Sequence, residues 1–245
     1  MPKRAWLFAG QSNMQGGIRP GECDQLCQKW PQGIELIEKE GPLDPPSLKT
    51  LGPELGFALE LMNLVPEAEG LFIKHATGGT NLANEWSIDG RPRVNEDPDH
   101  NHPCWGNFLK SFEIAGKLTK KTLQFEGFFW MQGERDSTQP IMAKTYATHL
   151  RELFERVREL TQQPKLPIVI GRITPRQMNQ EGTLHRHQFK EMVRQAQVQI
   201  SESDPHAAWV DADDLPQRKD ALHFSAPGSI ALGRRMARSW HQLSK

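Results

Sequence analysis

The sequence predicts an α/β protein in which a parallel sheet carries helices on both of its faces. Short apolar runs alternate along the chain with longer stretches of helical period, the pattern of successive strand–helix–strand units. The chain has 245 residues, enough for one sizeable core. It shows no internal repeat and no linker-like segment. We therefore expect one doubly wound domain over residues 1–245.

Five runs of apolar, β-branched or aromatic residues are short enough to be buried strands. They are residues 5–9, 71–74, 125–131, 167–173 and 207–211. These runs predict a five-stranded sheet. Residues 20–53 are rich in Pro and Gly, and residues 81–104 are polar with little periodicity. We expect both stretches to be long loops, which in compact domains either bind ligands or are disordered.

Longer segments between and after these runs have the period of amphipathic helices. They are residues 53–64, 106–118, 142–160, 184–201 and 227–243. In the third segment the residues spaced three or four apart are apolar, while Arg and Glu fill the other face. These apolar residues are Leu150, Leu153, Phe154, Val157 and Leu160.

The composition excludes several kinds of partner. Thirty basic and thirty acidic side chains cancel, which argues against nucleic acid or an anionic membrane surface as the partner and favours a neutral substrate. No apolar segment has the length of a membrane span or of a signal peptide, so we expect a cytoplasmic protein. Cys23, Cys27 and Cys104 are expected to be free thiols, with a Cys23–Cys27 bridge as the alternative.

Polar residues follow each predicted strand. The segments are 10–13 (GQSN), 75–81 (HATGGTN), 132–136 (QGERD), 174–176 (TPR), and 211–213 (DAD) with 220–223 (DALH). In an open parallel sheet, ligands bind outside the carboxyl ends of the strands, and these ends share one edge. The serine, histidine and acidic residues expected at this edge are typical of a hydrolase.

Ser12 is the candidate nucleophile at this edge. A serine hydroxyl needs a neighbouring imidazole to take its proton, and His223 is the best candidate. Asp220 precedes His223 by three residues, so its carboxylate can turn back to the imidazole and fix the tautomer. The alternative for Ser12 is that it only caps the segment that follows.

The oxyanion of an acyl-transfer intermediate needs hydrogen-bond donors that are already in place. We expect three: the backbone N–H groups of Ser12 and Gly79, and the side-chain amide of Gln132. Gly78 remains an alternative to Gly79, and the glycine pair could also form an ordinary turn.

Further residues are candidates for binding substrate. Gln11 and Asn13 flank the serine, and Arg176 could contact a sugar hydroxyl or an acidic substituent. Trp86, in the second long loop, either stacks on a sugar ring or pins that loop to the core. His100, His102 and Cys104 lie on one loop without a second cluster of ligands, so we expect no metal site.

Four motifs carry a resemblance to a known family. With GQSNM at 10–14, TGGT at 77–80, WMQGE at 130–134 and DALH at 220–223, the chain resembles the SGNH hydrolase superfamily. Within that superfamily it is most similar to carbohydrate esterase family 6 and the sialate O-acetylesterase-like proteins. The resemblance implies a flavodoxin-like three-layer α/β/α fold. It also implies a serine esterase that removes O-acetyl groups from sugars without a metal or an organic cofactor.

The resemblance assigns roles to individual residues. Ser12 matches the nucleophile, His223 the base and Asp220 its orienting acid, while Gly79 and Gln132 match the oxyanion-hole positions. Glu134 is the rival candidate for the third member of the triad.

The chain departs from the wider superfamily because it lacks Gly-Asp-Ser in its first motif and Gly-x-Asn-Asp in its third, which argues against lipase or thioesterase activity. Expected substrates are small or oligosaccharide acetyl esters, of the acetylxylan or sialate type.

Two functions are alternatives to a carbohydrate O-acetylesterase. One is a non-catalytic protein that binds carbohydrate or regulates another protein on the same fold. The other is an esterase of the α/β-hydrolase type, which needs Gly-x-Ser-x-Gly. Met14 stands where the second glycine would be, so the α/β-hydrolase reading is rejected.

Overall fold

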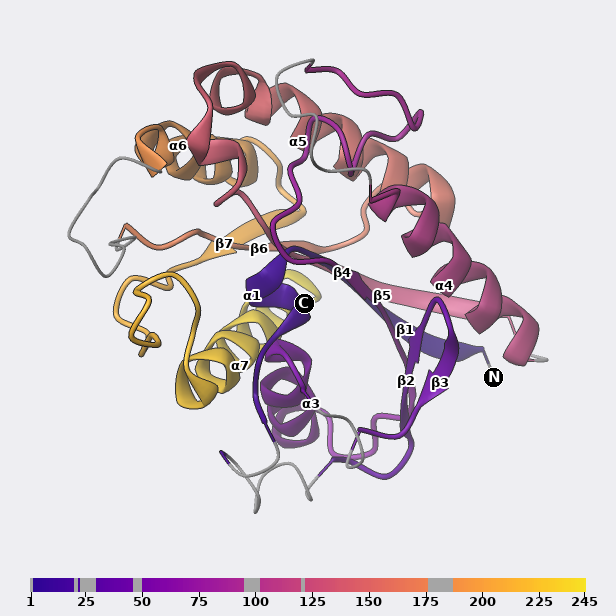
Figure 1. The fold of residues 1–245 in the computed structure, drawn as a ribbon. Coiled ribbons are helices and arrows are strands. Elements are labelled where there is room, and N and C mark those ends of the chain that lie inside the picture. Colours follow the sequence, from indigo (N-terminus) through magenta and orange to yellow (C-terminus); the bar gives the residue numbers. More distant parts are fainter. Residues whose placement is uncertain are drawn as a thin grey trace.

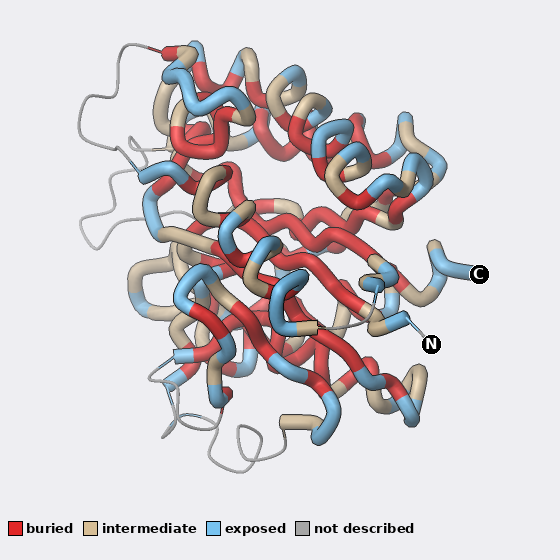
Figure 2. Tube along the Cα trace, turned by 90° about the vertical axis from the view of Figure 1, so that its right-hand side faces the viewer, coloured by how far each residue is buried: buried red, intermediate tan, exposed pale blue. Residues whose placement is uncertain are grey.

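A sheet of seven strands runs through the middle of the molecule, between two layers of helices (Figures 1 and 2). The strand order is β3-β2-β4-β1-β5-β6-β7. The computed structural model describes residues 2–19, 22, 30–45, 50–94, 102–119, 122–175 and 187–245. The predicted fold class, an α/β protein with a mostly parallel sheet flanked by helices, is confirmed.

The five predicted strands are all present and pair in parallel. They are β1 (Lys3–Gly10), β4 (Gly70–Ala76), β5 (Leu123–Met131), β6 (Ile168–Gly171) and β7 (Ala207–Val210). Their spatial order, β4-β1-β5-β6-β7, is the 2-1-3-4-5 order of flavodoxin-like folds. In that order the ligand crevice lies where the winding reverses, which here is between β1 and β5.

Two strands were not expected. β2 (Ile34–Glu38) pairs in parallel with β4, and β3 (Gly41–Leu43) turns back to pair antiparallel with β2. The prediction of a loop over residues 20–53 and of five strands was therefore wrong here. β2 has only five residues, of which Ile34 and Leu36 are buried and Glu35 is exposed. This short alternation of apolar and polar residues is a weak strand signal in a segment rich in Pro and Gly.

The helices lie on both faces of the sheet. α3 (Pro53–Leu64) and α7 (Ala226–Leu243) pack together on one face; α4 (Cys104–Leu118), α5 (Pro140–Thr161) and α6 (Lys190–Glu202) cover the other (Figure 1). All five predicted helices are present, although α6 begins later than residue 184. In the part of the chain that the structure describes, no helix is long and apolar enough to cross a membrane.

The core centres on β1. Residues 5–9 are completely buried, because both faces of this central strand are covered by helices (Figure 2). Around Phe8 the rings of Phe57, Phe72 and Phe129 lie with their centroids 4.8–5.2 Å from that of Phe8. Such aromatic pairs add about 0.5–1.5 kcal/mol each beyond the burial of their surface.

A cluster of polar and aromatic side chains joins α7 to the end of the sheet at which the parallel strands begin. The register between β1 and β5 shifts after Ala5, so that Glu126 has no partner in β1. Arg4 Nε donates to Glu126 Oε1 at 2.9 Å, and the guanidinium lies 4.8 Å from the ring centroid of Trp6. Trp240 Nε1 donates to the carbonyl of Glu126 at 2.7 Å. Helix α7 is thereby tied to the start of the sheet.

Candidate active site

The serine turn (residues 10–15) follows directly from β1. A Cβ atom on Gly10 would lie 2.0 Å from the carbonyl oxygen of Met131, so only glycine lets the chain leave β1 this close to β5. The N–H groups of Met14 and Gln15 both donate to the carbonyl of Gln11. This tight turn starts the one-turn helix α1 (Ser12–Gln15) and presents Ser12 at the carboxyl end of the central strand (Figure 1).

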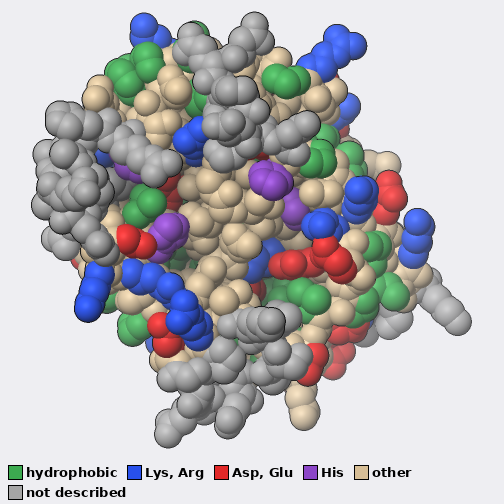
Figure 3. All heavy atoms as spheres, viewed as in Figure 1, with side chains coloured by type: hydrophobic (Ala, Val, Ile, Leu, Met, Phe, Trp, Pro, Cys, Tyr) green, Lys and Arg blue, Asp and Glu red, His purple; other side chains and the backbone are tan. Residues whose placement is uncertain are grey.

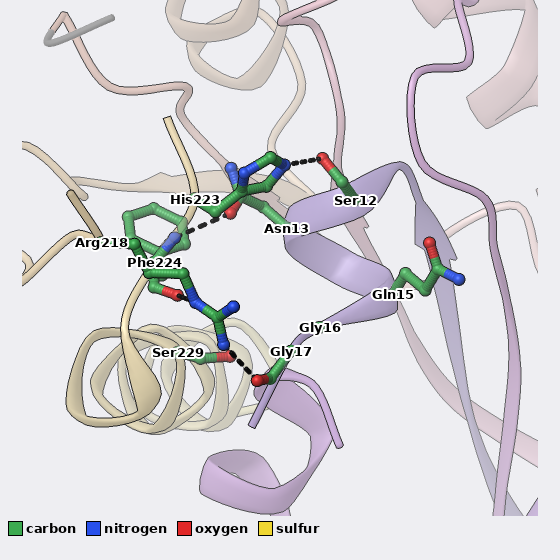
Figure 4. Close-up of a pocket in the computed structure, with 9 residues that line it drawn as sticks. All are labelled: Ser12, Asn13, Gln15, Gly16, Gly17, Arg218, His223, Phe224 and Ser229. Atoms are coloured by element: carbon green, nitrogen blue, oxygen red, sulfur yellow. Dashed lines mark hydrogen bonds between the residues drawn. The ribbon is translucent and has the colours of Figure 1, made fainter. Parts of the chain in front are cut away.

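Ser12 lies next to a histidine that is distant in sequence. His223 Nε2 lies 3.0 Å from Ser12 Oγ (Figure 4). On the other side of the ring, His223 Nδ1 lies 2.8 Å from Asp220 Oδ2. Both His223 and Asp220 belong to the histidine loop (residues 216–225), which precedes α7. The hydroxyl, imidazole and carboxylate thus form one hydrogen-bonded chain, the arrangement in which an imidazole can take the serine proton.

Asp220 shapes its own loop as well as contacting the imidazole. Its Oδ1 accepts the N–H groups of Leu222 and His223, at 3.0 and 2.9 Å. Burial by itself would raise the pKa of Asp220, but the hydrogen bonds from the backbone and ring of His223 and from Leu222 outweigh it and lower the pKa. Asp220 is therefore ionised at neutral pH and accepts the Nδ1–H of the ring.

Glu134, the rival acid, has a different neighbour. Its carboxylate is buried and Oε1 accepts from Asn13 Nδ2 at 2.7 Å. Burial raises the pKa of Glu134 in spite of this hydrogen bond. Of the two candidate acids, the structure places Asp220, not Glu134, in hydrogen-bond contact with the imidazole.

Gln11 and Asn13, the two residues expected to contact substrate, make most of their contacts inside the protein. Both side chains are buried, with exposed fractions of 3% and 4%. Gln11 Oε1 accepts the N–H groups of Gly133 and Arg135, at 3.4 and 3.2 Å. The two side chains flank Ser12 and hold neighbouring loops in place, and Asn13 also forms part of the wall of the hollow described below.

Two backbone N–H groups are available beside Ser12. Those of Ser12 and Gly79 donate to no group in the described part of the chain, whereas the N–H of Gly78 is taken by Gln15 Oε1 at 2.9 Å. Gly79 has a φ of +75°, which favours glycine, and no atom lies within 4 Å of the position of a Cβ there. The space on the Cβ side of Gly79 is therefore open.

Gln132 is not placed to be the third donor. It is completely buried, and its Nε2 lies 3.0 Å from Thr80 O, 2.5 Å from Asp136 Oδ2 and 3.3 Å from Gln11 Oε1. Its two N–H groups are therefore used inside the protein. The expectation that this amide donates to an oxyanion does not fit the structure, because the side chain is completely buried and its N–H groups already have acceptors inside the protein.

The aromatic residue of the second long loop is also turned inward. Trp86 is 1% exposed, its Nε1 donates to Thr80 Oγ1 at 3.3 Å, and its ring packs edge-on against Trp130 at 5.0 Å. Stacking of Trp86 on a sugar was therefore wrong, and the alternative, that it pins the loop, is correct. Arg176 falls outside the described residues, as do Cys23, Cys27 and His100.

A hollow of about 210 Å³ opens beside the Ser12–His223 pair. Its walls are the serine turn with the two residues after it, the histidine loop and the start of α7 (Figure 4). The lining residues are Ser12, Asn13, Gln15, Gly16, Gly17, Arg218, His223, Phe224 and Ser229. Figure 3 shows this face of the molecule, where histidines border a region of uncharged polar side chains and backbone.

Sequence reasoning missed Arg218. Arg218 Nη2 donates to the carbonyl of Gly17, and Arg218 Nε donates to the carbonyl of Phe224 at 3.3 Å. The guanidinium therefore bridges the two sides of the hollow. The signal was available: Arg218 stands two residues before Asp220 in the same polar loop.

The described residues contain no group of three His, Cys, Asp or Glu side chains placed to hold a metal ion. Cys104 is a free, buried thiol, as expected, and burial raises its pKa to about 12. At neutral pH it is protonated and hence a poor nucleophile.

Comparison with known proteins shows the family to which this chain belongs. A family model described as "Carbohydrate esterase, sialic acid-specific acetylesterase" matches residues 2–242. A probable carbohydrate esterase of Arabidopsis thaliana is 23% identical over 98% of this chain and 90% of its own length.

Solved structures share the fold. An Arabidopsis thaliana protein has a TM-score of 0.72 at 22% identity, covering 99% of both chains. A carbohydrate acetylesterase from Xanthomonas citri has a TM-score of 0.71 at 14% identity, covering 98% of this chain and 56% of that one. An acetyl xylan esterase from Geobacillus stearothermophilus has a TM-score of 0.54 at 16% identity, covering 96% and 94%. Since the family model spans almost the whole sequence, this chain belongs to the carbohydrate esterase family of sialic acid-specific acetylesterases.

Proposed function

We propose that this carbohydrate esterase hydrolyses O-acetyl esters of sugars through an acetyl-serine intermediate on Ser12. The observation that carries the proposal is the hydrogen-bonded chain from Ser12 Oγ through His223 to Asp220 at the carboxyl end of the sheet. Membership of an esterase family supports the same reaction.

In the first step, His223 Nε2 takes the proton of Ser12 while Oγ attacks the acetyl carbonyl carbon. The negative charge that develops on the carbonyl oxygen is held by the N–H groups of Ser12 and Gly79. Asp220 keeps the ring in the tautomer with hydrogen on Nδ1 and stabilises the imidazolium. The intermediate then breaks its bond to the sugar oxygen, which leaves with the proton from His223 Nε2.

In the second step, His223 takes a proton from water, and the hydroxide oxygen attacks the acetyl-serine. The same two N–H groups hold the second oxyanion. Its collapse releases acetate and returns the proton to Ser12 Oγ, so the enzyme is regenerated.

The alcohol part of the substrate belongs on the side of His223, because this residue protonates the leaving oxygen. The hollow beside His223 offers space there, and the polar side chains of Gln15, Arg218 and Ser229 in its mixed lining can form hydrogen bonds with a sugar. The family description favours acetylated sialic acid, while the name of the Geobacillus relative favours acetylated xylan. We propose an acetylated sugar of one of these two types as the substrate.

Acetate release by the purified chain from O-acetylated sialic acid, acetylated xylo-oligosaccharides and glucose pentaacetate tests this proposal. We expect turnover of at least one sugar ester, its loss in Ser12→Ala, and an acetyl group on the Ser12 peptide by mass spectrometry after rapid quenching. Binding of the sugar esters without Ser12-dependent release would instead support the non-catalytic alternative.

A further inference from the structure

The Ser12–His223 hydrogen bond joins two segments that are held separately by the fold. The serine turn follows directly after β1, whereas the histidine loop directly precedes α7. Their residues lie 211 positions apart in the sequence. The distance between oxygen and imidazole therefore depends on whatever fastens the turn to the loop.

The side chain of Asn13, next to the serine in sequence, makes this connection. Its Oδ1 accepts the N–H of Phe224 at 3.0 Å, and its Nδ2 donates to the carbonyl of Leu222 at 3.1 Å. These two peptide groups belong to the residues on either side of His223. One carboxamide thus binds the backbone before and after the histidine, as the edge of a neighbouring strand would.

Glu134 fixes the direction in which this carboxamide points. Asn13 Nδ2 carries two hydrogens, and the second is donated to Glu134 Oε1 at 2.7 Å. A carboxylate oxygen accepts hydrogen bonds, so the amide nitrogen must face both Glu134 and Leu222, and the amide oxygen must face Phe224. Both side chains are at least 96% buried, so water does not compete for these contacts.

The histidine loop needs such a fastening. Ala221, two residues before the histidine, has a φ of +50°, in the left-handed region that costs a residue with a Cβ about 1–2 kcal/mol. Within the loop, Asp220 Oδ1 holds the N–H groups of Leu222 and His223. Strain of this kind persists only where surrounding contacts hold the backbone in place.

We propose that Asn13 is a positioning residue that sets the distance between Ser12 and His223, and that Glu134 acts on the reaction through Asn13 and not through the imidazole. The inference rests on the proposed function, because it assigns both residues to the same reaction. It requires Glu134 to supply an acceptor oxygen to Asn13, not a negative charge to His223.

Substitutions separate these two requirements. Glu134→Gln keeps a carbonyl oxygen for Asn13 and removes the charge, while Glu134→Ala removes both. We expect Glu134→Ala and Asn13→Ala to lower kcat by about 10- to 100-fold with little change in KM, the loss produced by misplacing a catalytic group by about 1 Å. Glu134→Gln should keep kcat within about fivefold of the wild-type value. This decrease is far smaller than the decrease caused by removing a triad acid.

Glu60→Ala is the matched control. Glu60 of α3 is also buried, and its Oε1 accepts from Arg238 of α7. This variant should lose thermal stability without losing kcat. A fall in kcat equal to that of Asn13→Ala would mean that general loosening explains both.

A readout that does not need turnover keeps the inference testable if the proposed function fails. In the NMR spectrum the His223 ring resonances should respond to Ser12→Ala in the wild type but no longer in the Asn13→Ala background, because the contact is already broken there. A Glu134→Gln variant as impaired as Asp220→Asn, or an unchanged response in Asn13→Ala, would overturn the proposal.

Discussion

Replacing Asp136 by asparagine should flatten the dependence of stability on pH. Asp136 lies completely buried in the 3₁₀ helix η3 (Asp136–Thr138), below the carboxyl end of β5. Its two oxygens accept the N–H of Leu82, at 3.1 and 3.0 Å, and Oδ2 also accepts from Gln132. Burial raises the pKa of Asp136 to about 7 despite these donors.

The sign and size follow from the two pKa values. An aspartate in the unfolded chain has a pKa of about 3.9. At pH values between about 4 and 7 the folded chain keeps a proton that the unfolded chain has released, so stability falls as the pH rises through this window. This contribution is fully present below pH 4. With about 1.4 kcal/mol for each unit of pKa difference, the loss between pH 5 and pH 8 is on the order of 2–3 kcal/mol.

The asparagine of the Asp136→Asn variant imitates the protonated acid, because one oxygen can still accept from Leu82 and Gln132 while the group cannot ionise. Urea unfolding of both proteins at pH 5, 6, 7 and 8 measures the effect, and subtracting the two curves removes the other titrating groups. The wild type should lose about 2–3 kcal/mol more than the variant, or about 5–10 °C in Tm. Parallel curves, or a wild type that gains stability with pH relative to the variant, would refute the reasoning.

Three other substitutions test the candidate active site. Asp220→Asn puts an N–H donor beside His223 Nδ1 and favours the wrong tautomer, so kcat for acetate release should fall by about 10³–10⁴; a loss below tenfold would remove Asp220 from its role. Gly79→Ala places a methyl group in the open space beside the free N–H at a φ of +75°. It should cost about 1 kcal/mol in thermal denaturation but more than tenfold in kcat, and equal activity would exclude this N–H as an oxyanion donor. Trp86→Phe leaves a gap and removes the hydrogen bond to the Thr80 hydroxyl, so unfolding should become easier by about 1–3 kcal/mol while KM for the sugar ester stays constant; a raised KM at unchanged stability would revive stacking on the sugar.

The fold could be read from the sequence because its signals are strong. The run at residues 5–9 is apolar throughout since β1 is covered on both faces, and the helical period of α5 extends over several turns. The β2–β3 hairpin escaped because its strands have five and three residues and lie among Pro and Gly.

The meeting of Ser12, His223 and Asp220 could also be foreseen. In a parallel sheet the strand ends share an edge, and the Asp-x-x-His spacing brings the last two together. The directions of Gln11, Asn13 and Gln132 could not be foreseen. An amide side chain at a strand end can turn to the cleft or to the interior, and the choice depends on partners such as the Leu222 carbonyl, far away in the sequence.

The cluster of Arg4, Glu126 and Trp240 lies at the end of the sheet opposite to Ser12 and His223. Some of the contacts that stabilise the sheet thus lie far from the residues assigned to the chemistry. A lineage adapting to a warmer habitat, or an engineer, can rework the amino-terminal end while leaving the turnover number alone.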